Sequence, residues 1–259
     1  MLLAIDVGNT ETVLGVFEGE RLAWHWRMAT HGDRTADELA LLYGGFLGQH
    51  GLSFSRQITG VAIASVVPEQ TKALREMVHH YFHFQPVIVE PGVKTGISVA
   101  TDNPKEVGAD RIVNALAAHA MFGGPCVVVD FGTATTYDAV SGRGEYLGGA
   151  IAPGVRISAG ALFSETARLT RVELSPPRSI IGKNTVESIQ SGLLFGTAAE
   201  VDGMVERMQK ELGGSATGVV TGGLAETILP FCQTVDHHEP WLTLKGLRLI
   251  YEKNTGRDE

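Results

Sequence analysis

The stretch VVVDFGTATT, residues Val127 to Thr136, decides the fold, because nearly the same pattern occurs earlier as LLAIDVGNT at Leu2 to Thr10. Each copy is a short apolar run followed by Asp, a Gly among small residues, Thr and a second alternating run. An apolar run that ends in turn residues predicts a buried strand, and Val13 to Phe17 predicts its hairpin partner. We therefore predict two similar halves, each built on a hairpin with a tight turn.

Both turns have the composition of a phosphate site. Gly8 and Gly132 carry no Cβ atom, so a polyanion can approach the backbone N–H groups. Four neighbouring side chains add neutral donors: Asn9, Thr10, Thr133 and Thr135. A carboxylate repels phosphate, so Asp6 and Asp130 make sense chiefly if a cation lies between. A single D-x-G-x-T is also a common hairpin turn without function; its repetition favours a site that holds a nucleotide and a metal from two sides.

The repeated turn resembles the nucleotide-binding fold shared by actin, Hsp70 and sugar kinases. That resemblance implies an α/β fold of two similar domains with mixed sheets flanked by helices, a duplicated ribonuclease H-like motif. It does not select a reaction. A chain of 259 residues suits two domains. We expect them at residues 1–121 and 122–259.

Composition limits the functional classes. The chain is 44% hydrophobic and 19% charged, which predicts a substantial core. A net charge of -8 without a Lys/Arg cluster argues against a nucleic-acid surface. Cys126 and Cys232 form no disulfide framework. Without a signal peptide or an apolar run of about 18 residues, we expect a cytoplasmic protein that does not span a membrane.

The elements expected in the first half follow the order βββαβαβ. Besides the first hairpin, they are a strand at 22–28, a helix at 39–47, a strand at 60–67, a helix from Pro68 to about His80 and a strand at 86–90. Thr35 and Glu38 predict a capping box before the first helix. His79, His80 and His83 have the spacing of a helical metal pair, but no carboxylate or Cys accompanies them. A solvated cluster at a helix end is the favoured interpretation.

The segment NPKEVGADRIVN, Asn103 to Asn114, predicts a helix that starts near Asp110. Gly-Ala-Asp-Arg at a helix N-terminus offers a base, a cation and free backbone donors within one turn. The alternative is an Asp that satisfies the helix dipole beside a solvated Arg. The local sequence does not choose between the two.

In the second half we expect a strand at 146–151, helices at 156–169 and 242–253, and a strand at 217–223. Gly222 and Gly223 follow that last strand, where a flat adenosine can lie on the backbone. Asn184 opens a long amphipathic run interrupted by glycines, which favours close helix packing and subunit contact. The chain contains no G-x-x-x-x-G-K-[ST] motif.

Seven motifs in order resemble type III pantothenate kinase: DVGNT, NPKEVGADR, DFGTATT, GGAIAPG, GKNTVESIQSG, VVTGG and LTLKGLRLIYEKN. The resemblance implies ATP-dependent phosphorylation of the primary hydroxyl of pantothenate to 4'-phosphopantothenate, the first step of coenzyme A biosynthesis, by a cytoplasmic homodimer.

The resemblance also implies site residues. The first phosphate turn is Asp6, Val7, Gly8, Asn9, Thr10, Glu11, Thr12 and Val13, with Asp6 near Mg²⁺, and Thr133 lies in the second. The acceptor site is Gly108, Ala109, Asp110, Arg111 and Thr185, with Asp110 as general base and Arg111 as a partner for anionic groups. Asp130 matches a site for a monovalent cation, K⁺ or NH₄⁺.

One position departs from the family pattern. Many relatives carry Tyr two residues before Asn-Pro, where this chain has Thr101, so one wall of the acceptor pocket differs. The alternatives are a kinase for another small hydroxylated substrate and a non-catalytic regulatory protein that retains the fold. Intact Asp6, Asp110 and Asp130 count against the latter. An actin-like or Hsp70-like ATPase would need a longer chain.

Overall fold

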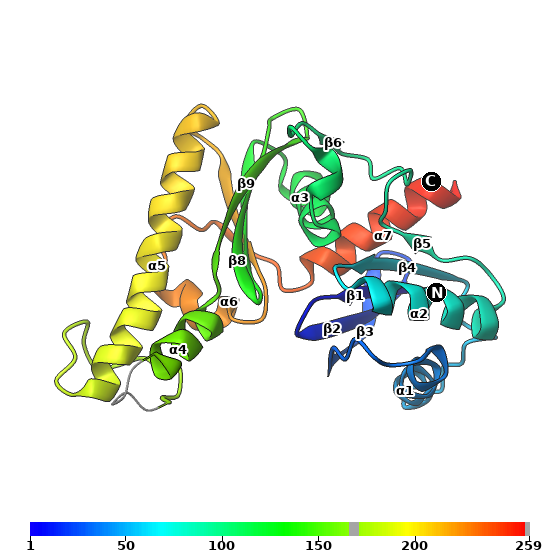
Figure 1. Ribbon diagram of the computed structural model, residues 1–259. Helices are drawn as coiled ribbons and strands as arrows, with labels where there is room; N and C mark the ends of the chain where they lie inside the picture. Colours follow the sequence, from blue (N-terminus) through cyan, green and yellow to red (C-terminus); the bar gives the residue numbers. More distant parts are fainter. Residues whose placement is uncertain (166–170, 257–259) are drawn as a thin grey trace. The chain divides into compact units, whose positions relative to one another are not determined.

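The computed structural model describes residues 1–165 and 171–256 (Figure 1). They form two compact units. Unit 1 comprises Met1–Ser98, Asp102–Ala117 and the residues from Leu242 on; unit 2 comprises Val99–Thr101 and Ala118–Trp241. This division differs from the expected single boundary after residue 121, because the chain returns at its end to the first unit.

Unit 1 contains a five-stranded sheet in the order β3-β2-β1-β4-β5. Its strands are β1 (Leu2–Val7), β2 (Glu11–Glu18), β3 (Arg21–Ala29), β4 (Gly60–Ser65) and β5 (Val87–Ile88). The first three pair antiparallel, whereas β4 is parallel to both β1 and β5. The sheet is therefore mixed, as expected.

Helices cover both faces of this sheet. On one face, α1 (Ala36–Gly48) and α2 (Pro68–Met77) build a core around alternate strand residues such as Leu3, Ile5 and Ile63. On the opposite face lies α7 (Leu242–Thr255), whose Leu244 occupies the space that a Cβ atom at Gly15 would need. α7 buries apolar side chains against β1, β2 and β4, and this burial is the physical reason that it belongs to unit 1.

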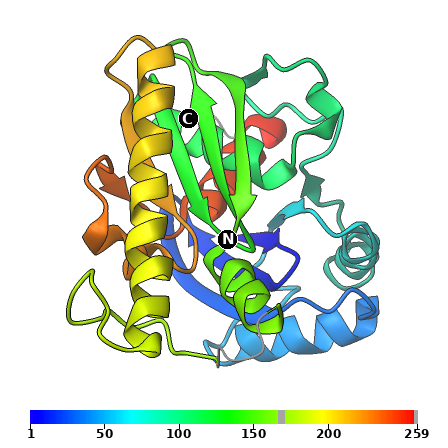
Figure 2. The ribbon, with the colours of Figure 1, turned by 60° about the vertical axis from the view of Figure 1, so that its left-hand side comes forward.

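Unit 2 contains a six-stranded sheet in the order β11-β10-β7-β8-β9-β6. Its strands are β6 (Ser98–Val99), β7 (Cys126–Phe131), β8 (Ala134–Val140), β9 (Glu145–Pro153), β10 (Thr217–Thr221) and β11 (His237–His238). The helices are α4 (Val155–Ser164), α5 (Thr185–Glu211) and α6 (Ala225–Ile228). α5 packs along the face that carries Val127, Val129 and Tyr137. Figure 2 shows this helix lying along the strands of the sheet.

The two sheets repeat one plan. β9-β8-β7-β10-β11 follows the same order and strand directions as β3-β2-β1-β4-β5. Even an irregularity recurs, since the register shifts between Val16 and Phe17 in one hairpin and between Ala139 and Val140 in the other. The predicted duplication is confirmed, and positions in the two units correspond residue by residue.

The remaining elements are helical. α3 (Ala109–Phe122) follows a 3₁₀ turn at Pro104–Glu106. α2 continues as a π-helical segment at Val78–Phe82, and another 3₁₀ turn covers Leu229–Phe231. The predicted strand at 86–90 shrinks to two residues, and the helix predicted at 156–169 ends at Ser164. Residues 166–169 of that prediction lie outside the described part.

The predicted capping box is present, and Asn184 also caps its helix. Thr35 accepts a hydrogen bond from the Glu38 N–H, and the Glu38 carboxylate accepts one from the Thr35 N–H at 2.8 Å. Those Thr35 bonds lower the pKa of Glu38. At the start of α5, Asn184 Oδ1 accepts from the Glu187 N–H at 2.9 Å. Local signals alone therefore locate both helix starts.

Among the described residues, no three or more His, Cys, Asp or Glu side chains form a group that could hold a metal ion. No helix within residues 1–165 and 171–256 is long and apolar enough to cross a membrane.

Candidate active site

The first turn joins β1 to β2 and is exposed at its tip. Gly8 donates its N–H to the Glu11 carbonyl at 3.0 Å, and a Cβ atom at Gly8 would lie only 3.1 Å from that oxygen. Asn9 and Thr10 are exposed, whereas Val7 and Thr12 are buried. The Thr12 hydroxyl is 2.8 Å from that of Thr30. Within the predicted stretch from Asp6 to Val13, the buried positions can therefore serve a nucleotide only through backbone groups.

The second turn joins β7 to β8 in the same way. Gly132 and Thr133 are exposed at its tip. The backbone of Gly154 packs directly against this turn, since a Cβ atom there would come within 2.2 Å of the Thr133 carbonyl oxygen. The Ala-Pro-Gly segment that follows β9 thus needs glycine at its last position, because only glycine lets the two backbones approach so closely.

Asp130 lies near the end of β7 and directly beside Gly222, which follows β10. The parallel pairing of the two strands places Thr221 opposite Asp130. Gly222 has a φ of +97°, and a Cβ atom there would lie 2.5 Å from Asp130 Oδ1. On the other side, a Cβ atom at Gly132 would lie 3.8 Å from the same oxygen. Because neither Gly222 nor Gly132 has a side chain, these positions place no Cβ atom against the Asp130 carboxylate. We call the two glycines the cradle of Asp130.

This cradle fits a weakly hydrated monovalent cation. Asp130 offers a carboxylate, and its cross-strand neighbours Thr136 and Thr221 carry hydroxyl oxygens. Oxygen donors of this kind suit hard cations. Asp6 likewise offers a single carboxylate, which suits Mg²⁺ because that ion takes its other ligands from water and substrate phosphates.

Asp110 lies in unit 1, in the first turn of α3. Its Oδ1 accepts a hydrogen bond from the Arg111 N–H at 2.9 Å, and a Cβ atom at Gly108 would lie 2.5 Å from the same oxygen. Burial raises the pKa of Asp110, against the opposing effects of the Arg111 N–H and the Arg111 charge. Gly108, Ala109, Asp110 and Arg111 are therefore brought together as predicted, with glycine required for the carboxylate to fold back.

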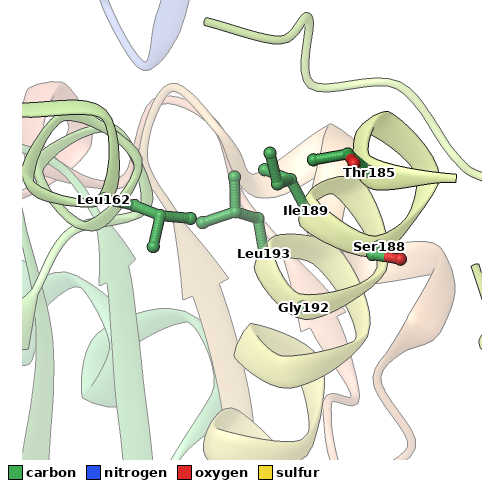
Figure 3. A pocket seen from close by; sticks show the side chains of 6 residues that line it. All are labelled: Leu162, Thr185, Ser188, Ile189, Gly192 and Leu193. Atoms are coloured by element: carbon green, nitrogen blue, oxygen red, sulfur yellow. The ribbon is translucent and has the colours of Figure 1, made fainter. Parts of the chain in front are cut away.

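Thr185, the first residue of α5, lines a cavity within unit 2. The cavity of about 310 Å³ is bounded by Leu162 of α4 and by Thr185, Ser188, Ile189, Gly192 and Leu193 of α5. Figure 3 shows Leu162 and Leu193 pointing toward each other across it. The pocket is mainly apolar, with the Thr185 and Ser188 hydroxyls at one end.

Thr101, the position that departs from the family pattern, lies beside β9. Its methyl carbon would be 3.7 Å from a Cβ atom at Gly148, and its buried hydroxyl oxygen has no hydrogen-bond partner within the described residues. The preceding residue, Ala100, donates its N–H to the Tyr146 carbonyl at 2.8 Å.

Comparison with known proteins decides the family. The sequence model described as type III pantothenate kinase matches residues 2–207. A type III pantothenate kinase of Streptomyces griseus is 56% identical and the match covers 99% of this chain and all of that protein. One from Frankia alni is 57% identical, with 98% and 100% covered. The chain belongs to the type III pantothenate kinase family.

As a pantothenate kinase, the protein phosphorylates pantothenate in coenzyme A biosynthesis. The family match includes Asp6, Asp110, Asp130 and Thr185 but ends before Gly222. The curated relatives extend over nearly the whole chain.

Solved structures agree on the fold of this pantothenate kinase. ROK hexokinase from Thermus thermophilus superposes with a TM-score of 0.56 at 14% identity, over 99% of both chains. The activator of 2-hydroxyisocaproyl-CoA dehydratase from Clostridium difficile, with bound ADPNP, gives 0.57 at 13% identity, over 100% of this chain and 97% of that one. At such identities these likenesses establish the actin-like and sugar-kinase-like fold alone.

Two polar residues near Asp130 were not singled out from the sequence. Thr221 and Thr136 are its partners on the two adjacent strands. The signal that could have found them is a threonine near the end of each of two predicted strands, but the strand register was needed to place them beside Asp130.

Proposed function

We propose that the enzyme transfers the γ-phosphoryl group of ATP to the primary hydroxyl of pantothenate, giving 4'-phosphopantothenate, with Asp110 as the general base. The observation that carries this proposal is the partly buried Asp110 carboxylate at the start of α3, whose pKa is raised by burial. A raised pKa brings a carboxylate closer to the working pH and makes it a better proton acceptor.

The Asp110 environment suits an acceptor site. Asp110 Oδ1 already accepts from the Arg111 N–H, which fixes the carboxylate and leaves Oδ2 for a substrate hydroxyl. The helix N-terminus and the Arg111 guanidinium favour an anionic group nearby, and pantothenate carries a carboxylate. Gly108 and Ala109 add no bulk at this point. We assign substrate binding to these four residues and to Thr185.

ATP is assigned to the two phosphate turns. Within the turn from Asp6 to Val13, the exposed tip at Asn9 and Thr10 offers donors to phosphate oxygens, as does the Thr133 hydroxyl. Gly222 with Gly223 supports the adenosine. Mg²⁺, held beside Asp6, supplies charge neutralisation when bound. Because phosphoryl transfer has a loose transition state, positioning and charge neutralisation by these groups account for most of the catalysis.

A monovalent cation, K⁺ or NH₄⁺, is assigned to Asp130. The cradle formed by Gly222 and Gly132 supports this assignment, since it keeps Cβ atoms away from the carboxylate. With a cation bound, the charge of Asp130 no longer opposes the phosphates of ATP.

We also assign a homodimer. Five large apolar side chains are exposed on α4, at the start of α5 and in the segment before it: Ile157, Leu162, Ile180, Ile181 and Val186. Ile180 and Ile181 are each more than 60% exposed, at 66% and 68%. A monomer rarely exposes such a patch. In a two-fold dimer the same surface meets itself, so Thr185, which lies in this region, can complete the acceptor pocket of the partner.

The partners that follow are ATP, pantothenate and a second copy of the chain. The net charge of -8 is unfavourable for binding nucleic acid, so we propose no nucleic-acid partner. Because the kinase draws on the cellular ATP pool, we propose that it works in the cytoplasm.

One assay tests the proposed reaction. Purified protein is incubated with Mg²⁺, ATP and pantothenate in potassium buffer, and both ADP release and product mass are measured. We expect phosphorylation at the primary hydroxyl. Phosphorylation of other small hydroxylated compounds in preference to pantothenate would favour the alternative kinase, and no phosphorylation would favour a regulatory protein.

A further inference from the structure

The two duplicated carboxylates have different neighbours at corresponding positions. In unit 1, the cross-strand partners of Asp6 are Val13 on β2 and Ala64 on β4. In unit 2, the corresponding partners of Asp130 are Thr136 on β8 and Thr221 on β10. Residues opposite each other in a sheet share one face. Asp130 therefore lies between two threonines, whereas Asp6 lies between two apolar residues.

Behind Thr136 lies a buried carboxylate. The Thr136 hydroxyl donates to Asp138 Oδ2 at 3.2 Å, and the Tyr146 hydroxyl donates to Asp138 Oδ1 at 2.8 Å. Asp138 and Tyr146 are buried, with 0% and 1% exposure. By strand register, Gly15 and Leu22 occupy the corresponding positions in unit 1. The polar arrangement thus distinguishes unit 2 from its own duplicate.

The direction of the Thr136 hydrogen bond has a consequence for Asp130. Since the Thr136 proton is directed to Asp138, the remaining lone pairs of the Thr136 oxygen stay available as acceptors. Its cross-strand neighbour Asp130 adds carboxylate oxygens on the same face of the sheet. Carboxylate and hydroxyl oxygens at neighbouring positions are ligands that a cation can use. Asp138 therefore orients the Thr136 hydroxyl so that its lone pairs remain available beside Asp130.

We propose that Thr136 contributes its hydroxyl oxygen to the monovalent cation at Asp130 and that Asp138, held by Tyr146, positions it. This inference rests on the cation assignment made above. It also explains why the duplicates differ. A K⁺ ion exchanges its hydration shell for protein oxygens, so hydroxyls beside the carboxylate help it. Mg²⁺ keeps several waters and needs few protein ligands. The apolar neighbours of Asp6, Val13 and Ala64, are therefore compatible with Mg²⁺ at that carboxylate.

The test measures cation binding without turnover. The unfolding temperature of the whole protein, saturated with Mg²⁺ and a non-hydrolysable ATP analogue, is followed while KCl replaces tetramethylammonium chloride at constant ionic strength. A ligand that binds only the folded state raises this temperature with its concentration. The K⁺ concentration at half effect, K0.5, is compared between variants.

We expect Thr136→Val, which removes a ligand oxygen, to raise K0.5 by at least about 10-fold, and Thr136→Ser to restore it. Asp138→Asn should also raise K0.5, because an amide NH₂ group takes the place of one acceptor. Tyr146→Phe should raise it less. The matched control is Tyr137→Phe, which removes a buried hydroxyl bonded to Glu200 at 2.9 Å on the face toward α5. It should lower stability and leave K0.5 unchanged.

The failures are distinguishable. If the wild type responds to K⁺ and Thr136→Val keeps the wild-type K0.5, the role of Thr136 is wrong and the cation at Asp130 stands. If Tyr137→Phe raises K0.5 as much as Tyr146→Phe, the effect is a general loss of packing and the positioning role fails. If wild-type stability does not respond to K⁺ at all, both the cation assignment and this inference fail, while pantothenate phosphorylation is measured separately.

Discussion

Gly222 lies against Asp130 so closely that a Cβ atom at position 222 would come within 2.5 Å of the Oδ1 atom. The backbone of Gly222 also has a φ of +97°, a conformation that residues with side chains avoid. The backbone turn after β10 and the Asp130 carboxylate therefore pack directly against each other. A side chain added at position 222 would displace the carboxylate.

Gly222→Ala should therefore lower both stability and cation binding. We expect a loss of about 1–3 kcal/mol in the free energy of unfolding from the strained φ and the clash, together with weaker activation by K⁺. Denaturant unfolding and K⁺ titration measure the two effects. Gly45→Ala in α1 is the control, since no atom lies within 4 Å of the added Cβ; it should stabilise by about 0.5–1 kcal/mol. An unaffected Gly222→Ala variant would contradict the cradle.

Asp110→Asn should lower kcat by about 10²- to 10⁴-fold and leave ATP binding unchanged, because the amide cannot accept the substrate proton. The Asn oxygen can still accept a hydrogen bond from the Arg111 N–H, so the local fold should persist. Steady-state kinetics and nucleotide titration distinguish the two effects. A variant with near wild-type turnover would remove Asp110 from the mechanism.

The same substitution has a predicted pH signature in stability. Burial raises the folded-state pKa of Asp110, so between its unfolded and folded pKa values the native state binds more protons. Wild-type stability contributed by this group therefore falls as pH rises through that window. Asp110→Asn avoids the cost of a buried charge. Its unfolding temperature relative to wild type should be more favourable at pH 8 than at pH 4, and the opposite trend would contradict the burial argument.

Kinase activity should require K⁺ or NH₄⁺ and be low in Na⁺ or Li⁺ alone. A weakly hydrated ion neutralises Asp130 next to the phosphates, whereas a strongly hydrated ion fits the protein oxygens less well. Initial rates in carefully exchanged buffers of equal ionic strength test this expectation. Equal rates in sodium and potassium would show that Asp130 has another role.

Mixed dimers should recover activity if the acceptor pocket is shared. Asp110→Asn and Thr185→Ala proteins, each weak alone, are combined and allowed to exchange subunits. Random pairing gives mixed dimers with one intact site, so about a quarter of wild-type activity should return. If Thr185 serves its own subunit, every site keeps one lesion. Proven exchange without recovery would therefore refute the shared pocket.

Local sequence signals were enough for much of the fold and for part of the candidate site. The two Asp-Gly turns, the capping box at Thr35 and the helix start at Asn184 depend on neighbouring residues, and so does the Gly-Ala-Asp-Arg cluster. Because turn chemistry and hydrophobic period act over a few residues, they can be interpreted without the tertiary structure. The duplication followed from the repeated pattern.

The tertiary structure alone decided which distant segments meet. β7 and β10 pair in a register that places Thr221 opposite Asp130, and α7 returns to the sheet of unit 1. The two-residue strands β5, β6 and β11 have too little pattern to predict as observed. Strand partners and register depend on the burial of whole faces between segments about a hundred residues apart. For that reason local patterns were enough to predict the turns and their carboxylates, whereas strand pairing was needed to show that Asp130, Thr136 and Gly222 lie together.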